Sequence, residues 1–338
     1  MNWYLQNGKE SDVVLSTRVR LSRNIKGIPF TTRCSKEDLK IVYDKMKEIT
    51  PSLGYGLKFF GLSDMDSITK QSLVEKHIIS PDFAKTKIPY TAIIINDEEN
   101  ICIMINEEDH IKLQVFTSGL DIDNLLNLAI EIDEKIGSIV QYSFHPKYGY
   151  LTACPTNVGT GMKISSLVHV PGFQMTGNIS KILNAVNNLG MNVRGIYGEG
   201  TKAEGDIYQI SNNQTLGITE KEIAKNLNLI SAKIIEQERI ARKYLAKKSV
   251  KFEDKVYRDF GILTFAKRLS EEETLELLSS VKLGTDLGII KELTDKKIAE
   301  LILYTKPANV QKRAGKKLSV LEQELARCEI IKQIIKED

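Results

Sequence analysis

The sequence has little of several features that would classify a protein quickly. Its 338 residues include only four cysteines, widely separated, so neither a disulfide framework nor a structural zinc site is indicated. No apolar run approaches the roughly 20 residues of a membrane span, and the start shows no cationic segment followed by an apolar one. Lysine and arginine together number 47 against 44 aspartates and glutamates, which excludes a general polyanion-binding surface. We therefore expect a cytoplasmic protein that binds neither membranes nor nucleic acid directly.

Two nucleotide-binding signatures are also missing. The chain has neither the G-x-x-x-x-G-K-[ST] spacing of a P-loop nor the G-x-G-x-x-G spacing of a dinucleotide-binding turn. Hydrophobic residues make up 42% and charged residues 27%, which is ordinary globular usage and excludes a disordered or fibrous chain.

Glycine is unevenly distributed along the chain, with 18 of the 22 glycines at or before Gly217. We therefore expect the last third of the chain to have a different architecture.

Helical and strand periodicities alternate in the first part of the chain. Apolar residues repeat at helical spacing over 39–49, 122–136 and 179–189. The β-rich runs are 90–96, 101–106, 138–144, 150–154, 163–170, 191–196 and 207–211. The first two runs are joined by a short polar turn, and Ile101 to Ile105 is apolar on both faces, as in a central covered strand. Residues 1–250 are therefore predicted to form an α+β domain, a largely antiparallel sheet flanked by helices.

The rest of the chain carries helical signals only. Thr219 with Glu222 and Ser270 with Glu273 have capping-box spacing, and an apolar stripe runs from Leu321 to Ile335. Residues 251–338 are therefore predicted to form a small all-helical domain. The stripe fits either core packing or a dimer contact.

Arginines and carboxylates gather in two segments. Arg18 and Arg20 share one face of an extended strand, where both guanidiniums could grip one polyphosphate, although paired arginines can also form a solvated edge. Glu107, Glu108 and Asp109 directly follow the buried strand, where grouped carboxylates are costly unless a cation binds. They could hold Mg²⁺ or clasp a cationic substrate, and an acidic turn is the alternative.

Two further segments add charge on glycine-rich loops. Gly159 and Gly161 would let the loop between Cys154 and Lys163 approach a ligand closely, and Cys154 reads as a reactive thiol or as a small buried residue. The loop around residues 194–200 adds one guanidinium and one carboxylate. Together the four segments offer cations for a nucleoside triphosphate and separated carboxylates for a cationic acceptor. This combination suits phosphoryl transfer, in which a protein mainly positions reactants and neutralises charge.

These segments, in this order, resemble the signatures of the ATP:guanido phosphotransferases, the arginine and creatine kinases. Within that family the chain is most similar to the bacterial protein-arginine kinases of the McsB type, over nearly its whole length. Small-molecule phosphagen kinases have a helical domain before the first arginine motif, and Arg18 lies too near Met1 for one. The resemblance therefore implies an acceptor site open to an arginine on a protein surface.

The resemblance also implies roles for single residues, with MgATP as the phosphoryl donor and the metal carried by the nucleotide rather than by the protein. Nucleotide ligands would be Arg18, Arg20, His77, Lys112, Lys163 and Arg194. Glu108 would be the general base, Glu199 a second carboxylate clamp, and Cys154 a neighbour of the acceptor nitrogen. Lys112 and Lys163 stand where the family usually has arginine, and lysine lacks the planar fork. Of a family phosphoarginine-binding motif near the C-terminus only Arg327 remains, so the sequence does not decide whether that site is kept.

By the same resemblance, the partners would be arginine-bearing proteins, an McsA-type activator, the CtsR repressor, the ClpC–ClpP protease and a second copy of the chain, in a stress response. Two alternatives remain open. One is a kinase for free arginine or another small guanidino compound. The other is a catalytically weak adaptor, which the two lysines favour and the retained Glu108, Arg18 and Arg20 oppose.

Overall fold

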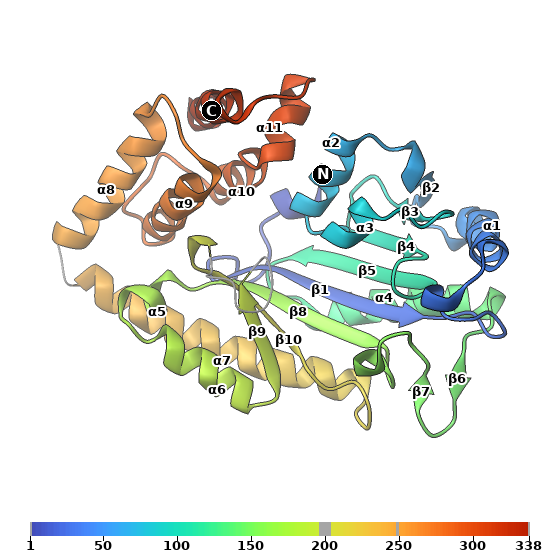
Figure 1. The fold of residues 1–338 in the computed structure, drawn as a ribbon. Coiled ribbons are helices and arrows are strands. Elements are labelled where there is room, and N and C mark those ends of the chain that lie inside the picture. Colours follow the sequence, from blue (N-terminus) through green and yellow to red (C-terminus); the bar gives the residue numbers. More distant parts are fainter. Residues whose placement is uncertain (1, 196–203, 248–249, 337–338) are drawn as a thin grey trace.

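The computed structural model describes residues 2–195, 204–247 and 250–336 (Figure 1). Its centre is an eight-stranded sheet in the order β2-β3-β4-β5-β1-β8-β10-β9, with every neighbouring pair antiparallel. The strands are β1 (Val14–Arg23), β2 (Lys58–Gly61), β3 (Ala92–Ile95), β4 (Ile101–Ile105), β5 (Ile111–Ser118), β8 (Met162–His169), β9 (Met191–Gly195) and β10 (Ile207–Asn212). The predicted α+β class, an antiparallel sheet with helices and a helical C-terminal region, is confirmed.

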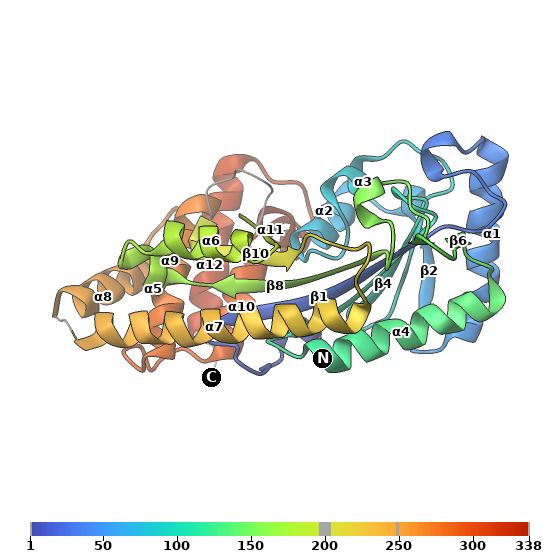
Figure 2. The ribbon, with the colours of Figure 1, turned by 90° about the horizontal axis from the view of Figure 1, so that it is seen from below.

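Helices cover both faces of this sheet. The remaining helices of the first part are α1 (Lys36–Leu53), α2 (Ser67–Glu75), α3 (Pro81–Lys85), α4 (Ile122–Ile139), α5 (Pro171–Met175), α6 (Ile179–Asn188) and α7 (Glu220–Lys247). The long helices α4 and α7 run along one face, where Val19, Ile103 and Leu113 join their apolar stripes in one buried core (Figure 2). Burial of this face leaves the alternate residues of the same strands on the opposite face.

The opposite face is apolar at one side and polar in the middle. Over β3 and β4 it packs against α2, α3 and the short helix Trp3–Leu5 in a second core that contains Cys102, Met104 and Phe116. Further along, β1 and its neighbours present Arg18, Arg20 and Gln114, which no apolar helix covers in the described part of the chain. Polar side chains on a central strand indicate a site rather than a core.

Five helices make up the C-terminal region, and they lie on the polar side of the sheet beside α2 (Figure 1). They are α8 (Val250–Phe265), α9 (Glu271–Asp286), α10 (Asp295–Tyr304), α11 (Pro307–Ala314) and α12 (Val320–Lys336), and they enclose a core of their own. None of the described helices is long and apolar enough to cross a membrane.

Helix starts follow the capping signals of the sequence. Ser35 and Asp38 form a full capping box at α1, Thr219 and Glu222 exchange the same bonds before α7, and Ser270 caps α9. These bonds satisfy N–H groups that a helix cannot pair internally.

Two expectations about strands were wrong. The run 138–144 is not a strand, because α4 continues to Ile139. Beyond it Tyr142 forms an isolated bridge with Ile25, and Phe144–His145 pairs, as β6, with Gly149–Tyr150, β7. The run 150–154 has only Tyr150 in a strand, since the chain then enters a turn, Pro155–Asn157. β-branched residues at the end of α4 are compatible with a helix or with a strand. The helix forms here because its apolar face packs in the core.

A buried carboxylate joins α2 to the C-terminal helices. Glu75 accepts hydrogen bonds from the backbone N–H groups of Ala308 and Asn309, at 2.7 and 3.1 Å, and from Asn309 Nδ2 at 2.9 Å. Burial, and less strongly the charge of Glu271, raises the pKa of Glu75 to about 7 although these donors oppose the shift.

This raised pKa predicts a pH dependence of stability. The folded protein binds this proton more tightly than the unfolded chain, so the contribution of Glu75 is complete below about pH 4.5 and is lost as the pH rises towards 7. We expect the free energy of unfolding to fall over that window by on the order of 2 kcal/mol from this group. Urea unfolding across the window should give a flatter profile for Glu75→Gln, and identical profiles for both proteins would contradict the assignment.

Candidate active site

Three arginines from distant parts of the chain meet at one cavity. Arg18 and Arg20 lie on the central strand β1, and Arg194 lies on the edge strand β9, three strands further out, opposite Gln209 of β10. The cavity has a volume of about 630 Å³, and we call it the arginine cavity. Its lining also includes His77, Ser80, Glu107, Lys112, Gln114, Gln209, Glu271, Pro307, Ala308 and Gln311.

The positive charge in this cavity is poorly compensated. The buried Nε atoms of Arg18 and Arg20 have no hydrogen-bond partner within the described ranges. Burial and the neighbouring guanidiniums of Arg20 and Arg194 lower the pKa of Arg18 to about 9. Burial also lowers the pKa of Arg20, but Glu107 and Glu108 act against that shift. Arg18 and Arg20 are half-buried, and cations in such a position with unused donors are costly by themselves and favour a polyanionic ligand.

The side wall of the cavity adds neutral hydrogen-bonding groups. Arg194 Nη2 donates to Gln209 Oε1 at 3.3 Å, which orients the guanidinium towards the cavity. His77 has a φ of +60° and lies just after α2. Burial, helped by Lys306 and Arg18, lowers the pKa of His77 to about 4, so its ring is neutral at pH 7.

Lys112, near the start of β5, is held by carboxylates on the turn that precedes the strand. Its Nζ pairs with Glu107 and lies 3.3 Å from Glu108 Oε2, while Ser80 Oγ donates to the other Glu107 oxygen at 2.9 Å. Burial would raise the pKa of Glu107, but Lys112 and these donors hold it below the usual value. The Glu108 side chain is 39% exposed and remains accessible from solvent. Lys112 therefore lines the cavity with its charge already shared, unlike Arg18.

A buried aspartate connects the acidic loop to the cysteine loop. Asp109 is fully buried, and its Oδ1 accepts from Asn24 Nδ2 and from the Ala153 backbone N–H, both at 2.7 Å. Asn24 Oδ1 in turn accepts from the His110 N–H at 3.0 Å. Sequence reasoning grouped Asp109 with the two glutamates and missed this role. The signal available was its position next to a buried strand.

Removing this carboxylate should be expensive. We expect Asp109→Ala to lower the free energy of unfolding by about 3 kcal/mol, because it leaves two buried N–H donors without an acceptor. Urea unfolding measures this, with Asp97→Ala, an exposed carboxylate on the β3–β4 turn, as the matched control. Similar losses for both variants would refute the role of Asp109.

The other predicted residues lie further from the cavity or outside the described ranges. Cys154 is half-buried beside Ala153, with Sγ 3.0 Å from Thr156 Oγ1. Lys163 pairs with Arg20 across β1 and β8 but is not in the lining of the arginine cavity. Glu199 lies outside the described residues. The described residues bring together no group of three or more histidines, cysteines or carboxylates that could hold a metal ion.

The two loop glycines approach other backbone rather than open space. A Cβ at Gly159 would lie 2.2 Å from Thr215 O, and one at Gly161 would lie 2.6 Å from Ser22 O. Both have positive φ. Packing against the chain therefore already requires glycine at both positions, and the expectation that they let the loop approach a ligand stays a prediction.

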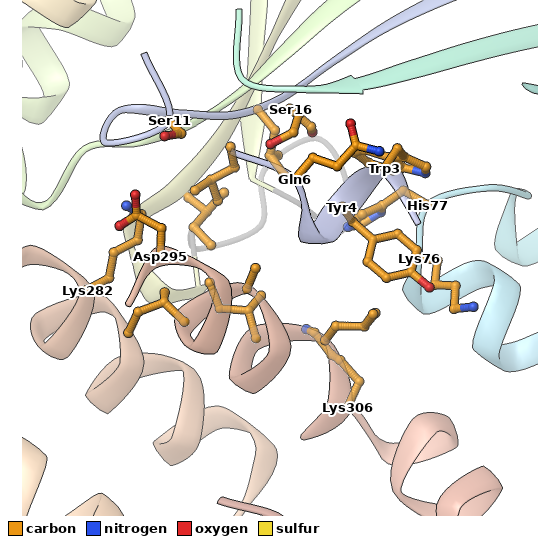
Figure 3. A pocket seen from close by; sticks show the side chains of 18 of the residues that line it. Trp3, Tyr4, Gln6, Ser11, Ser16, Lys76, His77, Lys282, Asp295 and Lys306 are labelled. Atoms are coloured by element: carbon orange, nitrogen blue, oxygen red, sulfur yellow. The ribbon is translucent and has the colours of Figure 1, made fainter. Parts of the chain in front are cut away.

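A second, smaller cavity of about 150 Å³ adjoins the first, with Glu75 and His77 in the lining of both. We call it the junction cavity. Figure 3 shows Lys282 and Asp295 at one end of it and Tyr4, Lys76 and His77 at the other. Its middle is mainly apolar, and sequence reasoning gave no sign of it.

Comparisons with known proteins agree along the whole chain. Residues 39–241 match the family described as ATP:guanido phosphotransferase, C-terminal catalytic domain, and residues 249–338 match the protein-arginine kinase McsB C-terminal domain. The chain is 44% identical to the protein-arginine kinase of Halothermothrix orenii over 98% of this chain and 95% of that protein. It is 40% identical to the protein-arginine kinase of Bacillus subtilis, over 98% of this chain and 92% of the relative.

Two solved kinase structures have a similar fold. The duplicated taurocyamine kinase from Schistosoma mansoni with bound transition state analog components superimposes with a TM-score of 0.63 at 27% identity, over 70% of this chain and 34% of that one. A lombricine kinase gives a TM-score of 0.60 at 25% identity, over 74% and 71% of the two chains.

Proposed function

The chain belongs to the protein-arginine kinases within the ATP:guanido phosphotransferase family, and from that premise we propose that it transfers the γ-phosphoryl group of ATP to arginine side chains of other proteins. The observation that carries this proposal is the arginine cavity, where buried guanidinium Nε atoms lack partners among the described residues beside an accessible glutamate. The phosphates of ATP would bind to the arginines, and the cationic guanidinium of the acceptor would bind to the glutamate.

On the donor side, Arg18, Arg20 and Arg194 would bind the phosphates of ATP. Forked guanidinium donors fit phosphate oxygens and would balance charge as it spreads over the moving phosphoryl group. Mg²⁺ would enter with the nucleotide, since its β- and γ-phosphate oxygens are ligands that this ion prefers. The neutral His77 ring would contact the nucleotide, and Lys163, next to Arg20, is a further candidate ligand.

On the acceptor side, Glu108 would hold the substrate guanidinium and take its proton. An arginine side chain loses a proton only above about pH 12 in water, so proton transfer must accompany bond formation. A guanidinium nitrogen forms a bond to the γ-phosphorus, the bond to the β-phosphate oxygen breaks, ADP leaves, and the proton passes to Glu108. Glu199 and Cys154 would complete the acceptor site.

The test is detection of phosphoarginine on a protein. Purified protein, MgATP and a protein acceptor should yield arginine phosphate in mass spectrometry under conditions that preserve the acid-labile N–P bond. ATP binding without any phosphoarginine would refute the proposal. An ADP-coupled assay that gives turnover with free arginine but none with protein arginine would favour the small-guanidino alternative, which the likeness to taurocyamine and lombricine kinases keeps open.

The paired state of Lys112 favours the adaptor alternative in one respect, because that cation is already neutralised by two carboxylates. We keep the kinase as the main proposal, since a binding protein has no need for half-buried, uncompensated arginines. As further parts of the proposal, residues 1–250 and 251–338 form two domains, the chain is a cytoplasmic homodimer, and it acts in a stress response with an McsA-type activator, the CtsR repressor and the ClpC–ClpP protease.

A further inference from the structure

The junction cavity lies between the sheet and the C-terminal helices. Ser16 of β1, Leu167 of β8 and His77 form part of its lining, and so do Leu275 of α9 and Ile298, Ala299 and Ile302 of α10. The arginine cavity likewise receives Glu271, Pro307 and Gln311. All these helical residues follow residue 241, where the match to the guanido-kinase catalytic domain ends. The C-terminal helices therefore add a large part of the wall of the junction cavity and a smaller part of the wall of the arginine cavity.

Buried polar contacts hold this wall in place. Glu75 accepts from the first N–H groups of α11, as described above. On α9, Ser279 Oγ donates to Asp206 at 2.7 Å and lies 2.9 Å from His169 Nε2. Arg242 of α7 pairs with Asp286 at 2.9 Å, and both side chains are buried. Contacts of this kind are costly to break, so the helices keep a fixed position against the sheet.

The two cavities together match the shape of one nucleotide. The junction cavity has an apolar middle, of a size that suits a flat base, and polar residues at its ends. Lys306 lines it near the boundary with the arginine cavity and pairs with Glu271 at 3.3 Å. A base in the junction cavity would send its phosphates past His77 towards Arg18, because His77 lines both spaces.

We propose that the C-terminal helices complete the ATP site, with α10 supplying the apolar surface on which the base packs. This inference rests on the proposed function, since it takes ATP as the ligand. ATP would then contact the sheet and the C-terminal helices at once, and its binding would stabilise the interface between them.

The test is a variant that fills the cavity from the helical side. Ala299→Trp should weaken ATP binding at least tenfold in calorimetry but change the affinity for inorganic tripolyphosphate less than twofold, because only the base loses its place. Ala314→Trp, on the exposed end of α11, is the matched control and should bind both ligands like the unsubstituted protein. Unchanged ATP affinity in Ala299→Trp, or equal losses for both ligands, would overturn the inference.

A measurement on the unsubstituted protein covers the case in which Ala299→Trp does not fold. ATP should slow amide hydrogen exchange in α10 and α11 more than tripolyphosphate does, and no such difference would also overturn the inference. Failure of the proposed function has another signature, which is absence of phosphoarginine. A protein that makes phosphoarginine but gives normal ATP affinity in Ala299→Trp would lose this inference alone.

Discussion

Glu108→Gln is expected to lower the turnover of protein-arginine phosphorylation by a factor on the order of a hundred or more, while ATP affinity stays within about twofold. The amide keeps the shape of the side chain but cannot take the proton that leaves the acceptor guanidinium. The side chain is 39% exposed, and among the described residues its carboxylate pairs with Lys112 alone, at 3.3 Å, so its replacement should leave stability nearly unchanged. Quantitative phosphoarginine mass spectrometry and calorimetry with ATP separate the two effects.

The control for this experiment is Glu134→Gln, an exposed carboxylate on α4 remote from the arginine cavity, which should behave like the unsubstituted protein. Activity of Glu108→Gln equal to that of the control would remove the general-base role. If phosphoarginine is absent from all three proteins, the adaptor alternative gains.

Replacing an arginine of the cavity should have opposite effects on stability and on binding. Arg18→Met removes a half-buried cation whose buried Nε has no partner in the described part of the chain, so we expect the free energy of unfolding without nucleotide to rise by about 1 kcal/mol. ATP affinity should fall about a hundredfold, because a forked contact to phosphate is lost. Urea unfolding and calorimetry measure the two quantities.

Replacement of Arg18 should raise the free energy of unfolding more than replacement of Arg20. Glu107 and Glu108 partly compensate Arg20, whereas Arg18 faces mainly other guanidiniums, so Arg20→Met should stabilise the protein less than Arg18→Met. Arg33→Met, at an exposed arginine on a short helix, serves as the control and should change neither quantity. A loss of stability in Arg18→Met would contradict the picture of an uncompensated cation held ready for a polyanion.

The candidate site could be predicted in part because its clearest elements are local. Arg18 and Arg20 stand two apart on a strand, and that alternation alone places both on one face. Strand β5 was not predicted, although the alternation of Ile111 and Leu113 with Lys112 and Gln114 indicates a strand. The pairing of Lys112 with Glu107 could also have been predicted, since the two residues are five apart across the turn before β5.

Contacts between distant segments were beyond any local pattern. The position of Asp109 next to a buried strand indicates burial, but it does not identify Ala153, 44 residues away, as its hydrogen-bond donor, and nothing around Glu75 points to Ala308. Such pairs form only where the packing of whole elements brings two backbones together, and a polar atom then finds whatever donor lies opposite.

By itself, then, the sequence determined the helix starts, the apolar face of the sheet, and the charged residue types that phosphoryl transfer requires, because propensity, capping and periodicity act within one or two turns of chain. Only the tertiary structure decided which charges remain uncompensated. The charge of Lys112 is paired with Glu107, whereas the Nε of Arg18 has no partner among the described residues. The C-terminal helices form one wall of the space beside these residues. Electrostatic compensation depends on distances across the fold, so it is settled when the strands and helices pack.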